Sequence, residues 1–274
     1  MKRLFTLFLL VITFSMFSFA VELTTKEKEW IKKHPKIILG SDTNWSPYII
    51  KNNDGIVIGY DTDILKRINE KTGANFQLTT GRWKDMLQKA KDKQIDGLST
   101  SAVHEKRKEF FNFSNNYVST QRLLVVSNTN PKKINSAKNL TNIRIGYQEK
   151  NLFDKKLVSR YKEATAIPLK SLEEILDNLI KGKIDATIGS HAIIYLANKK
   201  NLPYIKIVDT ISNSTLDLVF SVRKDYPEAI SILNKGLDSI SKNEKIKLHE
   251  KWFYHGQKQI EKENLVSLKI KKLK

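Results

Sequence analysis

The sequence has no cysteine among its 274 residues. Thiol catalysis, disulfide bonds and cysteine-ligated metal centres are therefore excluded. Stability must come from the burial of apolar side chains, which make up 40% of the chain beside 28% charged residues. This composition is typical of a globular protein, and the length allows one large domain or two of ordinary size.

Long apolar runs are lacking after residue 20. The single run covers residues 4–17, follows Lys2 and Arg3, and precedes the small residues Ser18 and Ala20. This layout predicts a signal peptide over residues 1–20. The alternative is an amino-terminal membrane anchor, but the run is short for a membrane span. We therefore expect a mature protein that is soluble and periplasmic.

Acidic residues are few relative to basic ones, with 29 Asp and Glu against 48 Lys and Arg, and a formal net charge of +19. Such a surplus attracts acidic ligands and anionic surfaces over long range. The lysines are scattered, however, and the predicted export argues against nucleic acid as a partner. We interpret the charge as a solvated, lysine-rich surface with a basic carboxy-terminal tail over residues 257–274.

Metal-binding patterns are also lacking. The five histidines, at positions 34, 104, 191, 249 and 255, show no i, i+4 pairing and no neighbouring carboxylate cluster. The chain contains no phosphate-binding loop and no Ser-His-Asp order. We therefore predict neither a metal site nor a cofactor.

Two stretches of the chain repeat one pattern. Residues 93–98 and 183–188 each contain a basic turn, an Ile-Asp pair and an apolar strand, and small polar residues follow each. Residues 36–42 and 142–148 each read as a short strand, a glycine and a polar loop. Helices alternating with such strands predict an α/β fold of two lobes, each a mostly parallel sheet flanked by helices.

The expected order of the lobes implies a hinge. Residues 21–118 form the first part of lobe 1, residues 119–222 form lobe 2, and residues 223–256 return to lobe 1. A chain that leaves one lobe and returns crosses between them twice, and two crossings allow the lobes to rotate. Ligands of parallel sheets bind at the carboxyl ends of the strands, so we expect a polar cleft between the lobes.

Residues 95–117 suggest what this cleft binds. A short strand over residues 95–98 is followed by Ser99, Thr100 and Ser101, and then by a charged helix start that contains Arg107. Backbone N–H groups at a helix start, hydroxyl donors and a guanidinium together form an anion site. The alternative is an ordinary strand–loop–helix joint with a solvated arginine.

Three motifs in this order resemble a known family. Residues 42–48 read D-T-N-W-S-P-Y, residues 59–64 read G-Y-D-T-D-I, and residues 105–114 read E-K-R-K-E-F-F-N-F-S. They are similar to motifs of the extracellular solute-binding proteins of family 3, and the resemblance covers residues 24–256. One residue separates Glu105 from Arg107, where the family has none. The resemblance implies the two-lobed periplasmic-binding-protein fold of type 2 and the uptake of polar amino acids.

The sequence resembles the Venus-flytrap sensing modules of bacterial sensor kinases still more closely. The similar stretches are residues 30–35, residues 185–190 with Tyr195 and Leu196, and residues 221–227. The chain departs from these modules because no transmembrane helix, kinase or cyclase follows. Unless it is a fragment, we expect it to act as a free monomer.

The resemblance implies ten ligand-binding residues: Asp42, Trp45, Trp83, Ser99, Thr100 and Arg107 from the first lobe, and Gln148, Lys150, Asn151 and Ser190 from the second. Arg107 would grip a carboxylate, Trp45 would pack on the apolar part of the ligand, and Asp42 would accept from a cation. Amino acid binders carry an acidic residue where this chain has Ser190. A dicarboxylate, another small carboxylate or an atypical amino acid is thus as probable a ligand as an ordinary amino acid.

The resemblance leaves three functions open. The first is a periplasmic binding protein that delivers a carboxylate-bearing solute to an ABC permease or a sensor. The second is an enzyme, a dehydratase for a cyclic acid such as arogenate or prephenate. It would need a general acid, for which Asp42 and Glu149 are candidates, and the neutral Ser190 disfavours it. The third is an accessory sensing module that touches anionic membrane through its basic tail. We favour the first and predict no catalytic activity.

Overall fold

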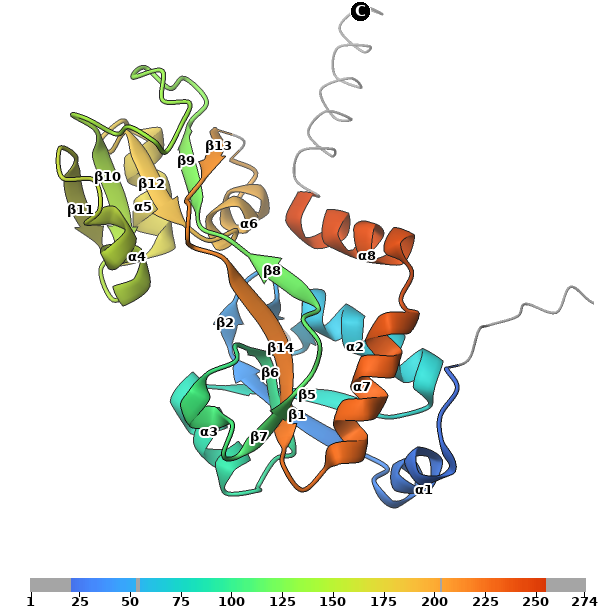
Figure 1. The fold of residues 1–274 in the computed structure, drawn as a ribbon. Coiled ribbons are helices and arrows are strands. Elements are labelled where there is room, and N and C mark those ends of the chain that lie inside the picture. The colour runs from blue at the N-terminus through green and yellow to red at the C-terminus, as the bar shows by residue number, and fades with distance from the viewer. Residues whose placement is uncertain (1–20, 53–54, 203, 255–274) are drawn as a thin grey trace, which may run out of the picture.

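The computed structural model describes residues 21–52, 55–202 and 204–254. It has two lobes, each built on one main sheet, with two chain crossings between them (Figure 1), and a small sheet of order β2-β3-β4 adds to the first lobe. The predicted signal peptide and the predicted basic tail lie outside the described residues. Mixed α/β architecture in two lobes confirms the predicted fold class.

The first lobe comprises α1 (Thr25–Lys33), β1 (Ile37–Asp42), β2 (Asn44–Trp45), β3 (Ile49–Lys51), β4 (Val57–Ile58), α2 (Tyr60–Thr72), β5 (Phe76–Gly81), α3 (Trp83–Lys91), β6 (Gly97–Ser101), the 3₁₀ turn η1 (Glu105–Arg107), β7 (Phe111–Phe113) and β8 (Val118–Thr120). The returning chain adds β14 (Leu216–Arg223), α7 (Pro227–Ser239), α8 (Lys242–His249) and the π-helical turn η2 (Glu250–Tyr254). The second lobe comprises β9 (Leu123–Ser127), β10 (Arg144–Gln148), α4 (Leu152–Val158), β11 (Thr165–Leu169), α5 (Leu172–Ile180), β12 (Ala186–Gly189), α6 (Ala192–Lys199) and β13 (Ile205–Thr210).

The two sheets share one topology. The first has the order β5-β1-β6-β14-β7, and the second has the order β11-β10-β12-β9-β13. In each sheet the three strands joined through helices are parallel, and the crossing strand beside them is antiparallel. The expectation of mostly parallel sheets thus holds for the βαβ units, whereas the crossing strands make both sheets mixed.

The repeated Ile-Asp pair has the same role in both lobes. The Asp96 backbone N–H donates to Ile38 O at 2.9 Å, and its carboxylate accepts from Ile38 N at 2.7 Å. Asp185 makes the same two bonds to the backbone of Arg144, both at 2.9 Å. Each aspartate therefore fixes the register of the central strand, β6 or β12, against its parallel neighbour, β1 or β10.

A glycine accompanies each of these pairs. A Cβ atom on Gly40 would lie 2.6 Å from Ile95 Cδ1, and one on Gly146 would lie 2.5 Å from Ile184 Cδ1. The isoleucine of the repeat thus packs directly on the backbone of β1 or β10, where no side chain fits. This explains the strand–glycine–loop pattern of both halves.

Strand β14 changes one expected boundary. Residues 216–222 were assigned to lobe 2 from the sequence, but β14 is paired with β6 and β7 of the first sheet. It also pairs with β8, so the outgoing and returning chains are hydrogen-bonded side by side. This long returning strand hydrogen-bonds with β6, β7 and β8 of the first lobe.

Helices cover both faces of each sheet, so each lobe has two apolar cores. In the first lobe, α1, α2 and α7 pack on one face, and α3 covers the other through Met86 and Ala90. In the second lobe, α4 packs on one face and α5 with α6 on the other. The strand ends that remain uncovered point to the space between the lobes.

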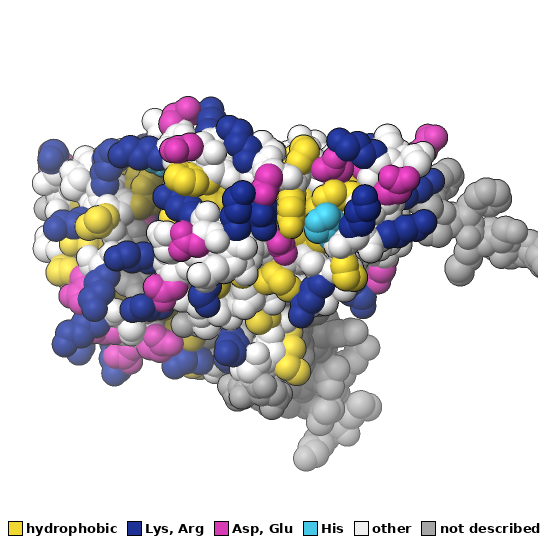
Figure 2. Space-filling view, turned by 90° about the horizontal axis from the view of Figure 1, so that it is seen from below, with side chains coloured by type: hydrophobic (Ala, Val, Ile, Leu, Met, Phe, Trp, Pro, Cys, Tyr) yellow, Lys and Arg dark blue, Asp and Glu magenta, His cyan; other side chains and the backbone are white. Residues whose placement is uncertain are grey.

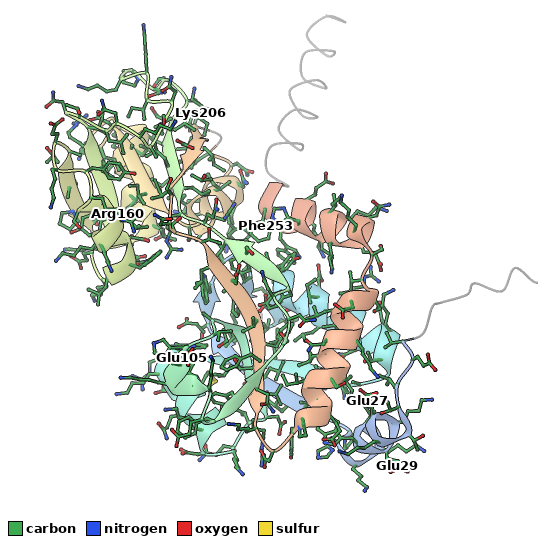
Figure 3. The ribbon with its side chains drawn as sticks, viewed as in Figure 1. Glu27, Glu29, Glu105, Arg160, Lys206 and Phe253 are labelled. Carbon is green, nitrogen blue, oxygen red and sulfur yellow. The ribbon has the colours of Figure 1, made fainter. Side chains whose placement is uncertain are left out.

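The ring of Phe253 in η2 joins the carboxy-terminal helix to both lobes. It stacks on the His249 ring with 4.3 Å between the ring centres. It also makes edge-to-face contacts with the rings of Tyr48 and His191, whose centres are 5.3 and 5.0 Å away. His191 directly precedes α6 of the second lobe. Figure 3 shows Phe253 close to the crossings, at the point where the two lobes approach each other.

Surface charge on the visible face of the space-filling view is mixed. Lys and Arg side chains are spread over this face, with Asp and Glu side chains among them (Figure 2). The distribution agrees with a solvated, lysine-rich surface on this side of the molecule. No helix within the described part of the chain is long and apolar enough to cross a membrane.

Candidate ligand-binding site

A cavity of about 470 Å³ lies where the strand ends of the two lobes face each other. Its lining residues are Asp42, Trp45, Trp83, Thr100, Ala102, Arg107, Arg122, Gln148, Asn151, Asp154, Leu172, Ile175, Thr187, Ile188, Gly189, Ser190, Ala192 and Ile193. Most come from the ends of β1, β6, β10 and β12 and from helix starts, whereas Trp45 lies on β2 and Arg122 lies between β8 and β9. The volume fits a small solute, and the polar strand ends supply groups that can orient it.

Eight of the ten predicted residues line this cavity, all except Ser99 and Lys150. Lys150 is exposed and points to solvent from the turn before α4. Ser99 is fully buried and donates to the carboxylate of Asp61 beneath the cavity wall. Thr100 donates to the same carboxylate but also lines the cavity, which Ser99 does not reach.

Arg107 is the cationic group of the first-lobe wall. Its Nη1 donates to Ser101 Oγ at 3.3 Å and to Ala102 O at 3.2 Å, and its guanidinium lies 5.2 Å from the Trp83 ring centre. Burial lowers the pKa of the guanidinium from its ordinary value. Arg107 forms no ion pair with any residue in the described ranges. A cation that is half-buried in this way can bind an anionic ligand group.

The aromatic and acidic residues of the first lobe complete this wall. Trp45 and Trp83 are half-buried and line the cavity, where their rings can pack on apolar ligand atoms. Asp42 lies at the end of β1 and accepts from the Trp83 backbone N–H at 3.3 Å. It therefore holds the first turn of α3 in addition to lining the cavity.

The wall at Thr100 is built on a buried aspartate. Asp61 accepts from Ser99 Oγ, from Thr100 Oγ1 at 3.0 Å and from Tyr117 Oη at 2.8 Å. Thr100 has φ of +52°, a conformation that a β-branched residue adopts only when its surroundings impose it. The hydroxyl of Ser41 contacts the Thr100 hydroxyl at 2.8 Å. This buried network therefore holds the Thr100 wall in place.

The pH dependence of stability should report on this network. Burial raises the pKa of Asp61 to about 6, although the three donated hydrogen bonds oppose the shift. Between pH 7 and pH 4 the folded protein takes up a proton that the unfolded chain does not. The group thus contributes about 2–3 kcal/mol more to the free energy of unfolding at pH 4 than at pH 7.

The test compares wild type with Asp61→Asn, whose side chain has no carboxyl group to titrate. In urea denaturation the stability of wild type relative to the variant should increase as the pH falls from 7 to 4. Other titrating groups act on both proteins and cancel from the difference. A difference that is flat across this range would show that Asp61 keeps an ordinary pKa.

Arg122 and Asp154 line the cavity but were not predicted from the sequence. Arg122 lies between β8 and β9, and its Nε donates to Asp154 Oδ1 at 2.5 Å. Burial raises the pKa of Asp154, although Arg122 opposes the shift. Asp154 has the appearance of an ordinary acidic residue in a helix first turn, and Arg122 lies in an extended segment. Only the folded chain brings the two together, so no local pattern could have identified them.

The second lobe contributes a mainly apolar wall. Leu172 and Ile175 come from the start of α5, Ile188 from β12, and Ile193 from the start of α6. Ser190 lies beside them, as the resemblance implied. The second-lobe carboxylate of the cavity is that of Asp154, on α4.

Comparison with known proteins identifies relatives of two kinds. The family model described as bacterial extracellular solute-binding proteins, family 3, matches residues 37–255. The sensor protein EvgS of Escherichia coli K12 is 25% identical over 248 residues, which cover 85% of this chain and 19% of EvgS. The arginine-binding periplasmic protein of Mannheimia haemolytica is 23% identical over 220 residues, covering 78% of this chain and 90% of that protein. The chain thus spans about a fifth of the sensor protein's length.

A solved structure shows the same fold. The periplasmic VFT2 domain of Bordetella pertussis BvgS superposes with a TM-score of 0.67 at 20% identity, covering 84% of this chain and 99% of that domain. The expected resemblance to the Venus-flytrap modules of sensor kinases is confirmed by these two sensor proteins.

Proposed function

Because the chain belongs to the bacterial extracellular solute-binding proteins of family 3, we propose that it traps a small carboxylate-bearing solute, an amino acid or a related organic acid, between its two lobes. The observation that carries this proposal is Arg107, a half-buried guanidinium in the cavity that makes no ion pair within the described chain. A ligand carboxylate supplies the missing counter-charge and accepts the guanidinium N–H groups bidentately.

Lobe closure is the mechanism that the architecture supports. Groups from both lobes line the cavity, so the bound solute contacts both lobes only when they approach each other. The ligand then stabilises the closed state by its additional contacts there. The two crossings, paired through β8 and β14, are the place where the rotation occurs.

The closed protein would act on a membrane partner, either an ABC permease or a sensor. Relatives named as amino-acid binders support the first partner, and the relatives within sensor proteins support the second. The chain would be exported to the periplasm, where its relatives' family acts, and would work as a monomer.

The alternative enzymatic function has less support. Of its two candidate acids, Glu149 is exposed and does not line the cavity, and Asp42 is engaged with the first turn of α3. A general acid must reach the reacting atom. The relatives are solute-binding and sensor proteins, so we do not propose a dehydratase.

A thermal-shift screen tests the proposed function. The panel contains the common L-amino acids and small organic acids, each amino acid paired with its decarboxylated amine. A ligand present at a hundred times its Kd adds about 2.7 kcal/mol to the free energy of unfolding, which raises Tm by about 5 °C or more. We expect such a shift from at least one carboxylate and none from its amine. Equal shifts from the two, or none from the whole panel, would contradict the proposal.

A further inference from the structure

Arg122 is fixed at the hinge by its backbone. Its N–H donates to Ser214 Oγ at 2.9 Å, and its carbonyl accepts from Ile211 N at 2.8 Å. Both partners belong to the returning crossing. The position of Arg122 is therefore set by both chain crossings together, which is the part of a two-lobed protein that moves least when the lobes rotate.

The side chain of Arg122 is held by the second lobe. Its Nε donates to Asp154 Oδ1, and its guanidinium lies 5.2 Å from the ring centre of Phe153. The side chains of Arg122 and Asp154 are only 12% and 6% exposed. A guanidinium packed in this way has a defined orientation, which makes it suitable for recognising a ligand.

A second ion pair of the same lobe shows how an arginine outside the cavity is bound in this fold. Arg144 uses Nε and Nη2 on Asp185, at 3.0 and 2.6 Å, and Nη2 also donates to Gly182 O at 2.7 Å. Arg122, by contrast, binds its aspartate, Asp154, through Nε alone. Its Nη nitrogens donate no hydrogen bond to any residue in the ranges that the structure describes, although the side chain is nearly buried and lines the cavity. Because the side chain lines the cavity, these uncommitted N–H groups are available to a ligand acceptor, and a hydrogen bond donated by a guanidinium is stronger than one from a neutral donor.

The charges of the cavity restrict the acceptor. The acidic and basic residues of its lining are Asp42, Asp154, Arg107 and Arg122, whose formal charges balance to zero. A zwitterion that gives its carboxylate to Arg107 keeps this balance. A second anionic group beside Arg122 would also lie close to Asp154 and be repelled. The favoured group is thus a neutral carbonyl, and the apolar wall at Ile175 and Ile193 suits the methylene groups before it.

We propose that Arg122, oriented by Asp154, is a second ligand anchor that selects amino acids whose side chain ends in a neutral carbonyl acceptor, such as a carboxamide. The inference rests on the proposed function, because it assumes that Arg107 takes the carboxylate of the ligand. It adds the chemical class of the side chain and the residue that recognises it.

Calorimetry with L-glutamine, L-norleucine and L-glutamate tests this inference. Glutamine and norleucine have side chains of similar length, and only glutamine carries the carbonyl. We expect wild type to bind glutamine at least about tenfold more tightly than norleucine and also more tightly than glutamate. In Arg122→Met the advantage of glutamine over norleucine should fall below about twofold, while norleucine affinity stays within about threefold of wild type.

Two further variants make the result decisive. Arg122→Met leaves Asp154 without its partner, so the double variant Arg122→Met/Asp154→Leu replaces the whole ion pair by apolar groups and protects the fold. Arg160→Met is the matched control, since Arg160 is an exposed second-lobe arginine outside the cavity (Figure 3). This control should keep the wild-type preference for glutamine.

The outcomes separate this inference from the proposed function. A wild type that binds carboxylates without preferring glutamine, or prefers glutamate, overturns the role of Arg122 and leaves the solute-binding function standing. A preference that survives in both Arg122 variants also overturns it. If no carboxylate of the larger panel binds, the proposed function fails and the inference fails with it.

Discussion

Replacing Arg107 by glutamine is expected to weaken binding of the solute about a hundredfold. A charge-assisted, bidentate hydrogen bond to a carboxylate in a partly buried site contributes roughly 3 kcal/mol, and each 1.4 kcal/mol corresponds to a factor of ten in affinity. Isothermal titration calorimetry with whichever carboxylate stabilises the wild type measures this loss. The affinity of Arg107→Lys should lie between those of wild type and Arg107→Gln, because lysine keeps the charge but lacks the planar guanidinium.

The stability of Arg107→Gln should remain close to that of wild type. Arg107 makes only two long hydrogen bonds to the first lobe, at 3.2 and 3.3 Å, so little is lost from the folded state. Arg67→Gln is a suitable control, since Arg67 pairs with Glu70 on the surface of α2. An affinity within threefold of wild type would remove Arg107 from the site. A large fall in Tm would mean that the loss of binding reflects unfolding.

The second large effect is expected from Gly97→Ala, which should destabilise the protein by about 3 kcal/mol or more. A Cβ atom at Gly97 would lie 2.1 Å from Ser221 O and 3.0 Å from Val222 Cα. Both belong to the backbone of β14, which is paired with β6 at this point and cannot retreat without breaking the pairing. Urea denaturation measures the loss.

Gly189→Ala provides the comparison for Gly97→Ala. Gly189 also lies on a strand at the centre of a sheet, but a Cβ atom there would meet nothing within 4 Å. Its replacement should change the free energy of unfolding by less than about 1 kcal/mol. If both variants unfold at the same urea concentration, the close approach of β14 to β6 is not a constraint on this fold.

The repeat of the two lobes was predictable because its signals are local. Each Ile-Asp pair and each glycine act within one strand and its neighbour, and the structure gives both copies the same contacts. The first-lobe site was accessible for the same reason. Asp42, Trp45 and Arg107 lie in short motifs, and each motif reaches the cavity because it directly follows a strand end.

The remainder of the site depends on tertiary pairing that spacing does not encode. Ser99 and Thr100 are adjacent, chemically alike and bonded to the same buried carboxylate of Asp61, yet only Thr100 lines the cavity. Arg122 and Asp154 are 32 residues apart and meet across the hinge. Strand β14 was placed in the wrong lobe because an extended apolar segment does not specify which sheet it joins.

The packing of the Phe253 ring depends on whether the cavity is occupied. It belongs to the carboxy-terminal turn, yet it touches His191, whose neighbour Ser190 lines the cavity. Rotation of the second lobe must change this contact. Occupancy of the cavity and packing of the carboxy-terminal turn are then energetically linked, and the linkage acts equally in both directions. A partner that binds η2 would therefore sense a solute that it never touches.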